Sequence, residues 1–308
     1  MELNERAQID TSQVDDRRGS GGGGGLGGLG GGGGIPIPSG KGGLIITLIV
    51  VGLTLLAGGY FGRGLVGGDS GDNTDLNAQC AQDNPGRLEQ TECRNALFIN
   101  SIQDYWTDGL PQSFGKPYQP AKTVFFAQGV NTACGQADSG VGPFYCPADH
   151  QVYIDLTFWD ELANRFGAEG EFAQPYVLAH EYGHHVQGLL GTEAQMRRAQ
   201  ERDPNNANKY SVMLELQADC YAGVWAKNAT GTTDQGGEKI FKSITQDDIN
   251  QALDAAAAVG DDAIQKKTGG PVNESEFTHG SSAERQSWFN RGFSGGDPKQ
   301  CDTFGNAL

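Results

Sequence analysis

Eighteen consecutive residues without a charged side chain, residues 44–61, constrain the fold of this 308-residue chain more than any other feature. At about 1.5 Å per residue, a helix over this stretch would be about 27 Å long, close to the thickness of the hydrocarbon core of a bilayer. The stretch has no polar face, and glycine-rich sequence flanks it on both sides. We therefore expect a single transmembrane helix that is not cleaved as a signal peptide, because a long segment precedes it.

This helix would divide the chain into a tail, an anchor, a linker and a domain. Residues 1–43 include an almost pure glycine run, which buries too little apolar surface to fold, so we expect a disordered tail. Residues 62–75 are rich in glycine and aspartate and are expected to form a flexible linker. Residues 76–308 have a globular composition and are long enough to form one domain.

Charge and cysteine content indicate the surroundings of this domain. The net charge of −16 disfavours nucleic acid as a partner, since phosphate binding requires a basic surface. All six cysteines follow the apolar stretch, which predicts disulfides and places the C-terminal domain outside the cytoplasm. We expect neighbours along the chain to pair: Cys80 with Cys93, Cys134 with Cys146, and Cys220 with Cys301.

The pattern of apolar residues predicts a mostly helical α+β domain with a small sheet. Helices are expected over residues 95–106, 158–166, 172–190, 192–202, 210–227, 245–259 and 281–289. Short strands are expected over residues 123–127 and 152–156.

Three of the five histidines lie in the sequence HEYGHH at residues 180–185. On a helix, His180 and His184 are four residues apart and therefore project from the same face. Two imidazoles at this spacing can bind one Zn²⁺, while Glu181 can reach a water on the metal. We predict one zinc ion per chain, with His180 and His184 as ligands, Glu181 as the catalytic base, and a structural role for His185.

A third protein ligand is expected in the helix over residues 210–227. Glu215 and Asp219 are again four residues apart, among mostly apolar neighbours. Two carboxylates are costly to bury unless positive charge meets them. We predict Glu215 as the third ligand and Asp219 as the acceptor that orients a ligand histidine. The alternative is a solvated acidic pair.

With these motifs the chain resembles the gluzincin clan of zinc peptidases, and more narrowly the bacterial neutral zinc metallopeptidases. Members of that family have a glycine-rich N-terminal tail and one anchor in the cytoplasmic membrane. The likeness covers nearly the whole chain and includes residues 145–149, 152–156, 180–187, 214–219 and 278–282. It implies a zincin-like domain that hydrolyses peptide bonds in a peptide or protein substrate.

The resemblance also implies roles for His279 and Arg285. Their spacing is similar to that of a histidine and an arginine in membrane-embedded gluzincins, although Gly280 stands where those proteins have proline. Both side chains are expected to stabilise the oxyanion of the tetrahedral intermediate. The alternatives are a surface position for His279 and an ion pair between Arg285 and Asp219 or Glu215.

Similar peptidases bind an extended substrate along an edge strand upstream of the metal helix. The strand over residues 152–156, with Tyr153 and Asp155, is expected to take this role by backbone hydrogen bonding. An ordinary core strand is the alternative.

Two other functions remain open at this point. One is a catalytically silent zinc-binding envelope protein, derived from a peptidase and kept for partner binding. The other is a structural envelope protein whose glycine-rich tail is its working part. The presence of Glu181 favours the peptidase.

Overall fold

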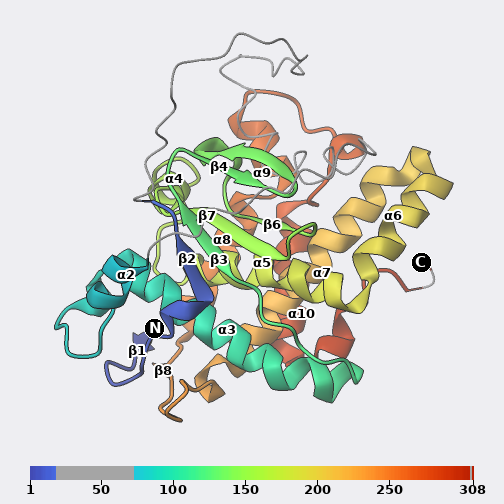
Figure 1. Ribbon diagram of the computed structural model, residues 1–308. Coiled ribbons are helices and arrows are strands. Elements are labelled where there is room, and N and C mark those ends of the chain that lie inside the picture. Colours follow the sequence, from blue (N-terminus) through green and yellow to red (C-terminus); the bar gives the residue numbers. More distant parts are fainter. Residues whose placement is uncertain (19–72, 306) are drawn as a thin grey trace, which may run out of the picture.

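The computed structural model describes residues 1–18, 73–305 and 307–308 (Figure 1). The apolar stretch 44–61 and the glycine run lie outside the described residues, as does the linker up to residue 72. In the part that is described, no helix combines the length and the apolar character that a membrane crossing requires.

The described chain is a mixed α+β domain in which helices predominate, as predicted. Its α-helices are α2 (Thr74–Gln79), α3 (Thr91–Phe114), α4 (Phe158–Asn164), α5 (Ala173–Leu190), α6 (Thr192–Arg202), α7 (Ala207–Asn228), α8 (Gln246–Ala258), α9 (Asp261–Lys267) and α10 (Ser282–Gly295). Its strands are β1 (Glu2–Leu3), β2 (Val14–Asp16), β3 (Thr123–Phe126), β4 (Gly129–Thr132), β5 (Gly135–Asp138), β6 (Phe144–Cys146), β7 (Gln151–Asp155) and β8 (Phe241–Ser243). The predicted helices all form, whereas α2, α9 and most of the strands were not foreseen.

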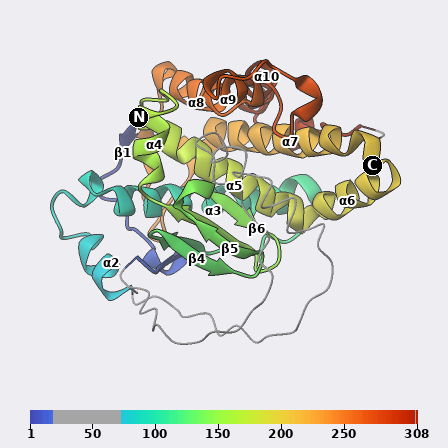
Figure 2. The ribbon, with the colours of Figure 1, turned by 90° about the horizontal axis from the view of Figure 1, so that it is seen from above.

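The largest described sheet has the strand order β2-β3-β7-β6. Its first three strands are parallel, and β6 runs antiparallel to β7. Two smaller sheets pair β4 with β5 and β1 with β8. Seen from above, α5 lies between β4, β5 and β6 on one side and α7 with α8, α9 and α10 on the other (Figure 2). Helix α5 is therefore the central element of the domain.

Helices α7 and α10 approach each other through two glycines. A Cβ atom on Gly223 would lie 2.0 Å from the carbonyl oxygen of Phe289, and one on Gly292 would lie 1.9 Å from that of Cys220. Any larger residue at either position would force the two helices apart. This contact matters for the site, because α7 and α10 both contribute side chains to it.

The three disulfides join Cys80 to Cys93, Cys134 to Cys146, and Cys220 to Cys301. The predicted pairing of neighbours is confirmed. The third bond closes a separation of 81 residues and fastens the C-terminal segment to α7.

The prediction of a disordered tail is wrong for residues 1–18. This segment forms β1 and β2, and its side chains Ala7 and Val14 are fully buried. The composition of residues 1–43 as a whole is dominated by the glycine run that begins at Gly19. Residues 1–18 themselves contain no glycine and carry apolar side chains.

Candidate metal centre

The site forms where α5 and α7 cross. A Cβ atom on Gly183 would lie 3.0 Å from the Cα atom of Ala218, so the backbones meet closely at this glycine. The contact brings one turn of α5, with His180 and His184, against the turn of α7 that carries Glu215. Helix α5 ends directly afterwards at Gly191, whose φ of 80° is the left-handed conformation usual at a helix C-terminus.

The side chains of His180, His184 and Glu215 form the one group of metal-binding character found among the described residues. One ligand atom from each lies within 4.8 Å of the others. The Nε2 atom of His180 is 3.2 Å from one carboxylate oxygen of Glu215, and the Nε2 atom of His184 is 3.4 Å from the other. Two imidazoles and one carboxylate leave a fourth position of a tetrahedral site open, so this donor set fits a zinc ion.

Asp219 orients His180 for this role. Its carboxylate accepts a hydrogen bond of 2.8 Å from Nδ1 of His180, which leaves Nε2 directed at Glu215. Tyr176 donates a second hydrogen bond of 2.6 Å to the same carboxylate oxygen. Burial opposes the charge on Asp219, but Arg285 and His180 outweigh it and lower the pKa of this carboxyl to about 2. Asp219 is therefore ionised, as predicted for an acceptor.

The pKa values of Glu215 and His180 are likewise set by burial and by the oppositely charged groups beside them. Burial raises the pKa of Glu215, yet His184 and His180 together hold it well below its ordinary value. Burial lowers the pKa of His180, but Asp219 and Glu215 raise it overall to about 10 in the metal-free site. The carboxylates thus favour positive charge at the two imidazoles. A bound cation could supply this positive charge in place of the imidazole protons.

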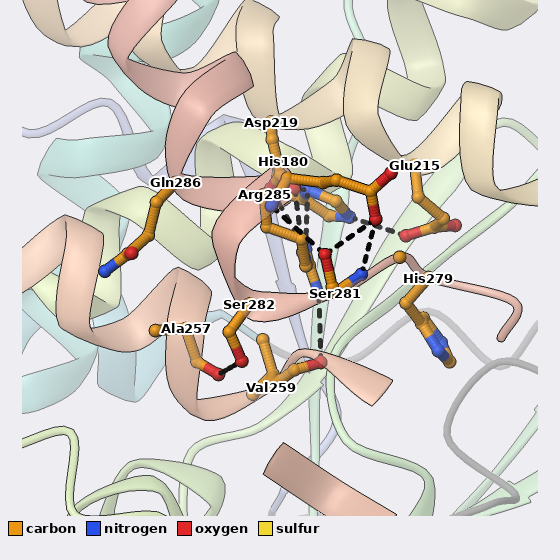
Figure 3. A network of polar contacts seen from close by, with 12 residues as sticks. His180, Glu215, Asp219, Ala257, Val259, His279, Ser281, Ser282, Arg285 and Gln286 are labelled. Carbon is orange, nitrogen blue, oxygen red and sulfur yellow. Dashed lines mark hydrogen bonds and ion pairs between the residues drawn. The ribbon is translucent and has the colours of Figure 1, made fainter. Parts of the chain in front are cut away.

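Arg285 is placed beside Asp219, and the ion-pair alternative describes its position. Its guanidinium donates to both oxygens of Asp219, at 2.7 Å from Nε and 3.0 Å from Nη2, and to the carbonyl oxygen of Val259 at 3.2 Å (Figure 3). The side chain is fully enclosed, at 3% exposure. Because these contacts occupy the guanidinium, Arg285 positions His180 through Asp219.

His184 has an orienting partner that the sequence analysis missed. Its Nδ1 atom lies 2.8 Å from the side-chain oxygen of Gln187, one turn further along α5. Gln187 is fully buried, and its amide nitrogen donates to the carbonyl oxygen of Leu214 and to the side chain of Gln217 on α7. Its position three residues after a ligand histidine was the signal available in the sequence.

Glu181 follows the first ligand and is buried on the same helix, at 8% exposure. Burial raises its pKa, and the neighbouring His180 and His184 oppose this effect only in part. A carboxylate with a raised pKa is a better proton acceptor than an exposed glutamate, which is the property that a general base requires.

His279 lies on the Glu215 side of this network (Figure 3). Its ring is held by Asp261. Its Nδ1 atom is 2.8 Å from one oxygen of Asp261, while the other oxygen accepts the backbone N–H groups of Thr278, His279 and Gly280. The Nε2 atom is buried and has no hydrogen-bond partner among the described residues. This atom is one of seven buried side-chain polar atoms without a partner among the described residues.

The structure explains why glycine, and not proline, follows this histidine. Gly280 has a φ of 94°, whereas the proline ring holds φ near −65°. A Cβ atom here would also lie 3.2 Å from the side chains of Leu216 and Val212 on α7. The backbone at this point therefore differs from that of proteases with proline here.

The strand over residues 152–156 was expected to be an edge strand, and this is wrong at Val152 and Tyr153. In the described sheet β7 pairs with β3 over residues 152–155 and with β6 over residues 151–153. Substrate binding by Tyr153 and Asp155 stays a prediction. Tyr153 is buried and donates to Asp149, and Asp155 is buried and accepts from Ser139 and Thr157. The alternating pattern reflects a core strand, and β6 is the outer strand on that side.

His185 has the predicted structural role. It is 1% exposed, and its Nε2 atom donates to the carbonyl oxygen of Gln119 at 2.6 Å. Burial lowers the pKa of this imidazole to about 4, so it is neutral at physiological pH.

Two histidines and a glutamate, supplied by α5 and α7 and held by buried polar side chains, form a cluster that could hold a metal ion and that has the donor set of a zinc site. The chain belongs to the family described as "putative neutral zinc metallopeptidase", whose model matches residues 3–304. The resemblance seen in the motifs is thereby confirmed.

The curated relatives of the chain are themselves described as uncharacterized. The protein YpfJ of Escherichia coli strain K12 is 41% identical over 302 residues, which cover 97% of this chain and 98% of that protein. The protein Rv2575 of Mycobacterium tuberculosis strain H37Rv is 46% identical over 218 residues, which cover 70% of this chain and 71% of that protein. No solved structure matches the chain.

Proposed function

We propose that this protein is a zinc-dependent peptidase with a zincin-like fold and one zinc ion per chain. The observation that carries the proposal is the convergence of His180, His184 and Glu215 within 4.8 Å, with Glu181 beside them. Zinc bound by these three residues supplies a Lewis acid that polarises a carbonyl oxygen and lowers the pKa of water. Proton transfer and stabilisation of the oxyanion are assigned to side chains of the domain.

Glu181 is proposed as the general base and then the general acid. It takes a proton from the water that attacks the scissile carbonyl and passes this proton to the leaving amine. Its burial and raised pKa support the first transfer, because a raised pKa makes the carboxylate a better proton acceptor.

His279 is proposed to stabilise the oxyanion that forms when water attacks. Because Nδ1–H is bonded to Asp261, donation from Nε2 requires the doubly protonated ring, and Asp261 is the counter-ion in contact with it. No local signal in the sequence marks Asp261, which lies 18 residues before His279 at the start of α9.

Replacing His279 by alanine is expected to keep the zinc and to lower kcat by about 10² to 10³, the usual cost of losing one oxyanion donor. Asp261→Asn should lower kcat in the same direction by a smaller factor, since the ring remains but its counter-ion is lost. Zinc content and kcat measured on the same preparations check this. Loss of zinc from His279→Ala would show that His279 is a ligand instead.

The rival function is a catalytically silent zinc-binding protein that serves only to bind a partner. It requires the same ligands but no base, and it gives no reason for a buried carboxylate at Glu181 or an unpartnered Nε2 atom on His279. Incubation of the purified chain with denatured casein, with and without a chelator, separates the two functions. Chelator-sensitive cleavage supports the peptidase, and zinc binding without any cleavage supports the rival.

We also propose that the folded domain lies outside the cytoplasm. The support is the use of all six cysteines in three disulfides, an arrangement that reducing compartments disfavour. Iodoacetamide applied to the unfolded protein is expected to label no cysteine before reduction and all six after it, as read by mass spectrometry. Six labelled thiols without reductant would contradict this placement.

A further inference from the structure

Residues 1–18 are built into the domain through backbone pairing at two places. Strand β2 pairs in parallel with β3, with Val14 opposite Thr123, and the N–H of Arg17 donates to the carbonyl oxygen of Phe125 at 2.8 Å. Strand β1 pairs with β8, which lies more than 200 residues later in the chain (Figure 1). The segment therefore contributes one strand to each of two sheets.

Side chains of the domain reach out to the backbone of this segment. The buried guanidinium of Arg87 donates to the carbonyl oxygens of Glu5 and Ala7, both at 2.6 Å. Asn100, also buried, exchanges two hydrogen bonds with the backbone of Asp10, at 2.8 and 3.0 Å. Without the segment, Arg87 and Asn100 would lose these partners, which is costly for buried polar groups.

The comparisons treat the segment as part of the same unit. The family match begins at residue 3, within β1, and the match to the Escherichia coli relative covers 97% of the chain. Residues 3–18 thus lie inside the region matched by the family model, together with α5 and α7.

We infer that residues 1–18 and residues 73–308 fold as one body within a single compartment. Paired strands lie about 4.8 Å apart, whereas a bilayer core is about 30 Å thick, so β2 cannot pair with β3 across a membrane. The two ends of the intervening stretch 19–72 are therefore on the same side of any membrane that the chain meets. This differs from the single-pass topology expected from residues 44–61, in which the tail lies inside and the domain outside. The inference does not depend on the proposed function.

Thiol labelling in intact spheroplasts tests the compartment. Ser12→Cys and Asp83→Cys each place one free thiol at an exposed position, the first in the N-terminal segment and the second in the domain. A membrane-impermeant maleimide is expected to label both variants or neither before lysis, and both after permeabilisation. Labelling of one variant and protection of the other in intact spheroplasts would overturn the inference.

Cleavage of the connection tests the packing itself. A specific protease site is inserted after Gly34 of the full chain. Cleavage there breaks the covalent connection between the N-terminal fragment and the domain. The fragment should remain with the domain through gel filtration, and Val14→Asp should release it, because Val14 is fully buried. Ser12→Asp introduces the same carboxylate at an exposed position and should retain the fragment. Release of the unmutated fragment would show that the segment is not part of the folded body.

Discussion

Replacing Glu181 by glutamine is expected to leave the zinc content unchanged and to lower the rate of peptide hydrolysis by at least about 10²-fold. Glutamine keeps the size of the side chain but cannot accept the proton of the attacking water. Glu181 is adjacent to a ligand yet is not one of the three residues whose donor atoms converge. Metal content by atomic emission and cleavage of a quenched peptide, both on the same sample, give the two values.

A matched control is Glu169→Gln, which makes the same chemical change at an exposed position. This variant should retain both zinc and activity. If Glu181→Gln instead hydrolyses peptide at the unmutated rate, Glu181 is not the base, and the mechanism assigned to the HEYGH segment is wrong.

Replacing Glu215 by alanine is expected to remove most of the bound zinc. It eliminates one of three protein ligands, whose carboxylate lies within 3.4 Å of both ligand imidazoles. Asp219→Ala leaves all three ligands in place but frees His180 from its acceptor, so zinc affinity should fall by roughly 10- to 100-fold. Zinc titration monitored by a competing chromophoric chelator measures both losses.

Glu201→Ala, at an exposed position on α6, serves as the control and should bind zinc as the unmutated chain does. Circular dichroism shows whether the Glu215 and Asp219 variants keep their helices. A folded Glu215→Ala protein with one full equivalent of tightly bound zinc would mean that another residue completes the site.

The two pairs of site residues were predictable because helical periodicity determines which side chains share a helix face. His180 and His184 are one turn apart, as are Glu215 and Asp219, so each pair shares a face once its segment is helical. Burying two carboxylates among apolar residues is costly unless positive charge lies nearby. The sequence therefore also indicated a positively charged partner. That partner proved to be His180 together with Arg285.

Contacts between distant segments could not be predicted in this way. Asp261 holds His279 from a separate short helix, and Tyr176 reaches Asp219 from α5, so neither shares a local period with its partner. The parallel pairing of β2 with β3 joins residues more than 100 positions apart, and no local signal marks it. The alternation in β7 is equally compatible with an edge and with a central strand, and only the sheet order distinguishes them.

Return of zinc to the metal-free protein tests the central claim most directly. The purified chain is freed of metal with a chelator, the chelator is removed, and peptide hydrolysis is measured as zinc is added in steps. The account predicts no hydrolysis without metal and a rate that rises to a plateau at one zinc per chain. Hydrolysis by the metal-free protein, or a fully loaded protein that cleaves no peptide, would contradict it.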